Sequence, residues 1–170
     1  MNNRKELSPV IWWIIGIIII SLVILFFIVF KNSAPKKISS QKTNREVALT
    51  CTTDMATEFH IHPNLEIFID GQKQEITKNI GINSGCMNAL HTHDNTGKIH
   101  VESPEKRDFT LSDFFAVWDK IYTKDQIFDY KIDQNHTMRQ TVNGKETYDY
   151  ENTILYDQDQ IVIYYEVLVK

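Results

Sequence analysis

The sequence predicts an α+β fold, in which an N-terminal transmembrane helix precedes one small domain with a mixed or antiparallel sheet and one principal helix. Three observations predict it: an apolar run over residues 10–30, alternating apolar and polar residues over 59–70, and a helical pattern of apolar residues after Thr110. Alternation with period 2 is typical of a half-buried strand, and spacing of three and four residues is typical of an amphipathic helix. The order of hairpin, helix and closing strands also fits a β-grasp-like arrangement.

Residues 10–30 are predicted to be a membrane anchor in contact with lipid, preceded by a short tail at 1–9. The run is apolar apart from Gly16 and Ser21. At ~1.5 Å per residue it is long enough to cross the roughly 30 Å hydrocarbon core of a bilayer. A cleaved signal sequence is the alternative, but its apolar region is normally shorter and the small residues before Pro35 make a poor cleavage site.

The basic residues beside the run bear on its orientation. Two precede it, Arg4 and Lys5, and five follow it, namely Lys31, Lys36, Lys37, Lys42 and Arg45. This count alone would place the domain in the cytoplasm. However, a short basic tail before an apolar run is also typical of a signal anchor, and the two cysteines of the domain resemble an oxidised pair. We therefore expect a single-pass protein of the cell membrane whose C-terminal domain is extracytoplasmic.

Residues 31–50 are predicted to be a polar tether, and residues 51–170 one domain of ordinary size. The chain has a formal charge of -4, and its first 50 residues carry seven Lys or Arg against two acidic residues, which leaves -9 for the domain. So acidic a domain repels nucleic acid and attracts cations. We expect no nucleic-acid partner, whereas another membrane or exported protein is compatible with this sequence.

Cys51 and Cys86 are the two cysteines of the chain. Their spacing resembles no zinc-finger pattern, and a disulfide closing such a loop is typical of a small exported domain. Two buried thiols and two soft metal ligands are the alternatives. We expect a disulfide.

The first strand of the domain is predicted over residues 59–70. One parity is apolar, while the other is mostly polar and includes His60 and His62. Because successive side chains of a strand point to opposite faces, both histidines should lie opposite the core. Asp70-Gly71 is typical of a hairpin turn, so residues 73–76 would form the return strand.

An ordered loop is predicted over residues 81–97, followed by a short strand over 98–102. In that strand Ile99 and Val101 should point inward, and His100 and Glu102 outward. The loop contains His91, His93 and Asp94, after which Asn and Gly favour a turn.

One helix is predicted from Thr110, which forms a capping-box-like start with Asp113. Its apolar stripe is predicted to be core and consists of Leu111, Phe114, Phe115 and Trp118. Asn143-Gly144 indicates a second hairpin after residues 136–142, and residues 161–169 are apolar on both parities, which is typical of a central strand.

Several segments together resemble a family of uncharacterised membrane-anchored or exported prokaryotic proteins. These segments are His60-Ile61-His62-Pro63, Leu90-His91-Thr92-His93-Asp94, Ile99-His100-Val101-Glu102-Ser103 and Phe109-Thr110-Leu111-Ser112-Asp113-Phe114-Phe115 with Trp118. The resemblance covers roughly residues 59–166 and implies an exported domain, but no activity. Members often carry aromatic residues where Asn88-Ala89 stand here, and glycine where Ser112 stands.

Five of the six histidines fall in one part of the sequence, which is the density that proteins use to hold a metal ion. They are His60, His62, His91, His93 and His100. Neutral imidazole is the commonest metal ligand, and several imidazoles suit a transition metal such as zinc or copper. We expect the two His-x-His pairs to converge on about one ion, with His100 as a further candidate ligand. The carboxylates of Asp94 and Glu102 are expected to accept hydrogen bonds from imidazoles and so orient them. The isolated His136 is not expected to take part.

The predicted function is therefore capture, buffering or transfer of a transition metal by a membrane-anchored domain. A metal-dependent hydrolase or oxidoreductase is an alternative, in which an open coordination position holds water and Asp94 or Glu102 accepts a proton. No separate catalytic motif supports it. A structural or partner-binding domain without metal is the third interpretation, and in it the histidines form a hydrogen-bond network.

Overall fold

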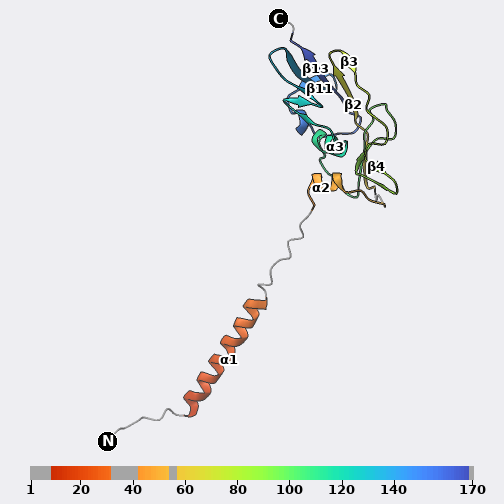
Figure 1. The fold of residues 1–170 in the computed structure, drawn as a ribbon. Coiled ribbons are helices and arrows are strands. Elements are labelled where there is room, and N and C mark those ends of the chain that lie inside the picture. Colours follow the sequence, from red (N-terminus) through yellow and green to blue (C-terminus); the bar gives the residue numbers. More distant parts are fainter. Residues whose placement is uncertain (1–8, 32–41, 54–56, 169–170) are drawn as a thin grey trace. The chain divides into compact units, whose positions relative to one another are not determined.

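The structure is a computed structural model that describes residues 9–31, 42–53 and 57–168. The chain divides into two units, Met1–Ser40 and Gln41–Lys170, and each is described by itself (Figure 1). Most of the predicted tail and the first part of the predicted tether lie outside the described residues.

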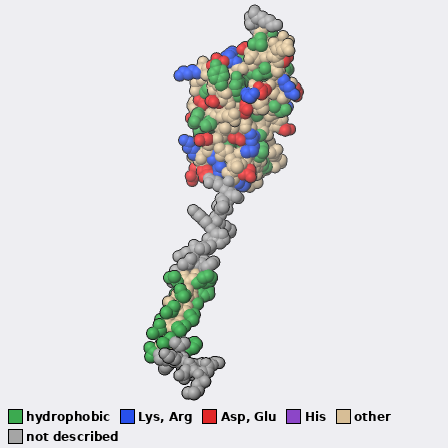
Figure 2. All heavy atoms as spheres, turned by 90° about the vertical axis from the view of Figure 1, so that its left-hand side faces the viewer, with side chains coloured by type: hydrophobic (Ala, Val, Ile, Leu, Met, Phe, Trp, Pro, Cys, Tyr) green, Lys and Arg blue, Asp and Glu red, His purple; other side chains and the backbone are tan. Residues whose placement is uncertain are grey.

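The first unit contains one apolar helix, α1, over Pro9–Lys31. Residues Val10–Phe27 have a mean hydropathy of 3.0 and are long and apolar enough to cross a membrane. Apolar side chains line the part of this helix whose side chains are described, residues 10–27 (Figure 2). A helix satisfies its own backbone hydrogen bonds, which is what a span through lipid requires.

The second unit begins with a short helix, α2 (Asn44–Leu49), inside the predicted tether. The Thr43 side chain accepts a hydrogen bond from the Glu46 N–H, and the Glu46 carboxylate accepts one from the Thr43 N–H. Ala48 is fully buried in the core, so the folded domain extends N-terminally beyond the predicted boundary at residue 51.

A mixed five-stranded sheet forms the larger layer of the domain. Its strands are β2 (Asn64–Ile69), β3 (Gln72–Lys73), β11 (His136–Val142), β12 (Lys145–Thr147) and β13 (Gln160–Val167). The order is β12-β11-β13-β2-β3, with β13 parallel to β2 and the other pairs antiparallel (Figure 1). The predicted central strand and second hairpin are confirmed, and the β-grasp-like arrangement stays a prediction.

The predicted strand over 59–70 is divided in two. β1 (Phe59–Ile61) ends before Pro63, and β2 begins at Asn64. Proline has no N–H to donate to a strand partner, and the His62 N–H donates to the Asp157 carboxylate at 2.8 Å. β1 is therefore not part of the large sheet. It pairs with β7 (His100–Ser103), which in turn pairs with β6 (Leu90–His91). The return strand, β3, is also shorter than predicted and shifted toward the turn.

The remaining elements are short strands, which pair with strands near them in sequence, and one 3-10 helix. They are β4 (Ile82–Asn83), β5 (Cys86–Met87), β8 (Tyr122–Thr123), β9 (Gln126–Ile127), β10 (Tyr130–Lys131) and the 3-10 helix η1 (Tyr150–Asn152). The disulfide between Cys51 and Cys86 is confirmed, and it joins the segment after α2 to β5.

The predicted helix is confirmed as α3 (Leu111–Val117). Asp113 accepts hydrogen bonds from the Thr110 N–H and hydroxyl, and the apolar stripe is buried except for the partly buried Trp118. The described core runs from Ala48 to Tyr165 and so lies entirely within the second unit. The domain thus carries its own hydrophobic core, which is the main source of folding free energy.

Candidate metal centre

Two segments that are distant in sequence cross beside the start of β2. The Leu65 N–H donates to the Gly97 carbonyl at 2.9 Å, and the Ile99 N–H donates to the Pro63 carbonyl at the same distance. Gly97 has φ +90°, and a Cβ there would lie 2.2 Å from the Leu65 carbonyl oxygen. Only glycine permits so close an approach. This crossing holds His62 against the start of β7.

The register of the three-stranded sheet β1-β7-β6 places four polar residues on one face. His60 pairs with Glu102, and His100 pairs with His91. Direct partners in an antiparallel sheet share a face, as do residues two apart on one strand. His60, Glu102, His100 and His91 therefore all point to the same side, opposite the buried Ile99 and Val101.

The structure brings all five predicted histidines together. His62 follows β1, and its ring centroid lies 4.3 Å from that of His60 and 4.7 Å from that of His100. His93 follows β6, and its ring centroid lies 4.8 Å from that of His91 and 4.6 Å from that of His100. Ring nitrogens that could hold a metal ion form two groups, His60/His62/His100 and His91/His93/His100, and the atoms of each group lie within 4.8 Å of one another. His100 belongs to both.

His91 is the most deeply buried of the five histidines, and a hydrogen bond to the backbone sets its tautomer. Its Nδ1 lies 3.1 Å from the Asn88 carbonyl oxygen, which can only accept, so Nδ1 carries the proton. The Nε2 lone pair then faces His93 Nε2 at 3.2 Å. Burial lowers the pKa of His91, so the ring stays neutral and able to ligate. A backbone carbonyl on the second nitrogen is typical of metal-binding histidines.

His100 is also held neutral. Burial, together with the neighbouring His93, His62 and His91, lowers its pKa to about 4. Its side chain is 20% exposed, so solvent still reaches the ring. A neutral imidazole that solvent reaches is in the form that binds a cation from solution.

Two carboxylates adjoin the first group. Glu102 Oε1 lies 3.0 Å from His60 Nε2 and 3.9 Å from His100 Nδ1. Asp157, in the turn before β13, lies 3.8 Å from His62 Nδ1. No local motif marks Asp157, because the contact joins residues far apart in sequence.

Asp94 and His136 have other roles in this structure. The Asp94 carboxylate accepts hydrogen bonds from the Thr96 N–H and hydroxyl and closes the turn after His93. His136 contacts Asp133 and stacks on Tyr165 at the far end of β11, away from the other histidines.

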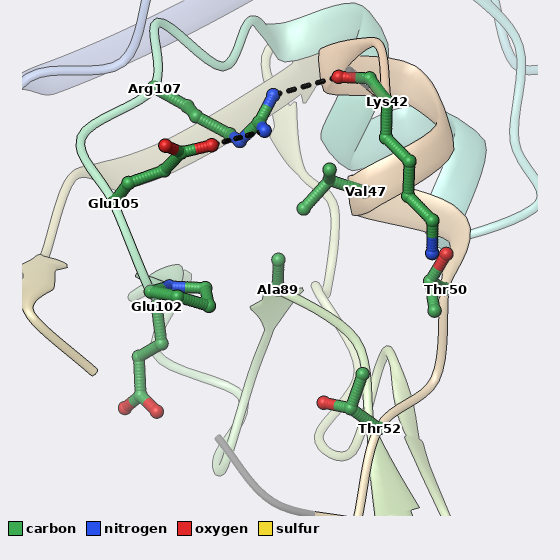
Figure 3. A pocket seen from close by; sticks show the side chains of 9 residues that line it. Lys42, Val47, Thr50, Thr52, Ala89, Glu102, Glu105 and Arg107 are labelled. Atoms are coloured by element: carbon green, nitrogen blue, oxygen red, sulfur yellow. Dashed lines mark hydrogen bonds and ion pairs between the residues drawn. The ribbon is translucent and has the colours of Figure 1, made fainter. Parts of the chain in front are cut away.

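A small hollow adjoins the centre on the Glu102 side. It has a volume of about 210 Å³ and is lined by Lys42, Val47, Thr50, Thr52, Ala89, Glu102, Pro104, Glu105 and Arg107. Figure 3 shows Arg107 at one end, bound to Glu105 and to the Lys42 carbonyl, and the Glu102 carboxylate pointing away from that end. Glu102 thus contacts both the hollow and the histidines.

No protein family, curated protein or solved structure matches the chain in comparisons with known proteins.

Proposed function

We propose that this chain is a single-pass membrane protein whose extracytoplasmic domain binds a transition-metal ion, zinc or copper, for capture, buffering or transfer. The observation that supports this most is the convergence of five of the six histidines from three separate segments. Imidazole clusters suit zinc and copper better than calcium or magnesium, which prefer oxygen ligands.

The electrostatics of the site supports binding of a cation. Lowered pKa values keep His91 and His100 neutral, which is the form that ligates. Glu102 supplies negative charge beside two of the imidazoles.

The disulfide and the apolar helix support the proposed location. Cys51 and Cys86 form a bond that is rare in the reducing cytoplasm, and α1 is long enough to span a bilayer. We therefore place the metal site outside the cytoplasmic membrane, where ions and exported partner proteins can reach it.

Metal titration of the purified full chain in detergent tests the binding function. After treatment with a chelator, zinc and copper(II) are titrated in calorimetry into the parent, His100→Ala and His136→Ala. We expect His136→Ala to bind as the parent does. His100→Ala should lose more metal affinity than the ~10- to 100-fold that is typical when a group hydrogen-bonded to a ligand is replaced. No binding of either ion to the parent, or equal affinity in His100→Ala, would refute the proposal.

Thiol labelling and protease protection on intact cells test the location. We expect external protease to cleave the domain, and the two cysteines to resist labelling until the protein is denatured and reduced. A domain protected from external protease, with two free thiols, would place it in the cytoplasm instead.

A further inference from the structure

We infer that the centre has two ion positions that share His100, and that Glu102 is a ligand of one of them. This inference rests on the proposed metal-binding function and specifies its capacity. It differs from the expectation from sequence that both His-x-His pairs bind about one ion. The reason is that the five histidines form two overlapping groups in the structure.

The first position lies between β1 and β7. His60 Nε2 is 3.0 Å from Glu102 Oε1 and 3.5 Å from His100 Nδ1, and the latter two atoms are 3.9 Å apart. Three points with these separations lie on a circle of about 2.0 Å radius, so an ion near its centre would be at roughly zinc-ligand distance from each. Glu102 is therefore positioned to bind the ion directly, rather than to orient a histidine ligand through a hydrogen bond. His62 completes this position as a fourth donor, since its ligand nitrogen lies within 4.8 Å of the other two histidines.

The second position lies beside β6. His91 Nε2 and His93 Nε2 are 3.2 Å apart, and two nitrogens on a tetrahedral zinc ion are separated by about 3.3 Å. The hydrogen bond from His91 Nδ1 to the Asn88 carbonyl leaves the Nε2 lone pair pointing to this position. We expect it to fill first, because its buried ligand is already oriented.

His100 can serve both positions because its two ring nitrogens, Nδ1 and Nε2, point outward from the ring in different directions. Nδ1 faces His60 and Glu102, and we assign Nε2 to His91 and His93, whose ring centroids lie 5.4 and 4.6 Å from that of His100. The ion that binds later enters the position between β1 and β7. It replaces the remaining N–H proton of His100, and this proton leaves to solvent. Two close cations repel each other, so the ion that binds later should bind more weakly than the one already present. The negative charges of the Glu102 carboxylate and the deprotonated His100 offset part of this repulsion.

The test counts ions per chain at saturation with zinc alone, using the full chain in detergent. The chain has four methionines and two cysteines, so the ratio of zinc to sulfur in elemental analysis measures the count without a protein assay. His60→Ala with Glu102→Gln removes ligands of the first position only, and His93→Ala removes a ligand of the second. His93 is exposed, so this variant avoids a cavity in the core. His136→Ala is the matched control.

We expect two zinc ions per parent chain and per control chain, and one per chain in each of the two position variants. With copper(II), the doubly loaded parent should give less paramagnetic resonance signal per copper than either variant, because ions on one imidazole couple magnetically. One ion at saturation in the parent would overturn the two positions and leave the proposed function standing. Two ions retained in either variant would also overturn the inference, and no ion in the parent would overturn both.

Discussion

The disulfide between Cys51 and Cys86 is expected to contribute a large share of the domain's stability. The bond joins residues 35 apart, and the loop-closure entropy that it removes from the unfolded chain corresponds to about 4 kcal/mol at 25 °C. Domains of this size are stabilised by roughly 5–15 kcal/mol in total. Replacing both cysteines by serine should therefore lower the melting temperature by about 10–15 °C without changing the fold.

Native contacts around the bond support an effect that acts mainly on the unfolded chain. Thr52 and Met87 exchange two backbone hydrogen bonds at 2.8 and 3.0 Å, and the Asn88 side chain donates to the Ala48 carbonyl at 2.9 Å. These interactions hold the same two segments together without the covalent bond. Circular dichroism of the double variant should accordingly show a native spectrum at low temperature.

The assay is urea unfolding of residues 41–170, the unit that contains the whole described core. The Cys51→Ser and Cys86→Ser double variant is compared with the parent, and the parent in reductant is the control that should match the variant. A loss of unfolding free energy below about 1 kcal/mol would refute the entropic reasoning. So would a parent that behaves identically with and without reductant.

Three further predictions concern the site and its supports. The metal-free domain should lose stability as pH falls from about 6.5 toward about 4. In this pH range the unfolded chain binds more protons than the folded domain, because folding lowers the pKa values of His91 and His100. The urea midpoint should therefore fall less across this range in His100→Asn than in the parent. Gly97→Ala should destabilise the domain by about 2–4 kcal/mol, since its Cβ would meet the Leu65 carbonyl at 2.2 Å in a backbone with positive φ; an unchanged urea midpoint would contradict the close crossing. Asp94→Asn should change zinc affinity less than about tenfold in calorimetry, because the turn at Thr96 and not an imidazole uses this carboxylate; a greater loss would show that Asp94 is part of the centre.

Features that depend on neighbouring residues could be predicted from sequence. The apolar run predicts α1, the capping pair of Thr110 and Asp113 predicts the start of α3, and Asn143-Gly144 predicts the second hairpin. The short helix α2 carried a similar signal, since Thr43 and Glu46 have capping-box spacing, but the surrounding residues lack apolar periodicity. Its burial depends on α3, where Asp113 pairs with Arg45 at 3.2 Å.

The sequence by itself determined which side chains could hold a metal, because imidazole density and His-x-His spacing are local properties. Only the tertiary structure decided how they are grouped. Pro63 separates β1 from β2, and hydrogen bonds of Leu65 and Ile99 join two segments that are more than 30 residues apart. This crossing places His100 between the two His-x-His pairs. No periodicity encodes such a crossing, since its register is set by backbone hydrogen bonds and by the absence of a side chain at Gly97.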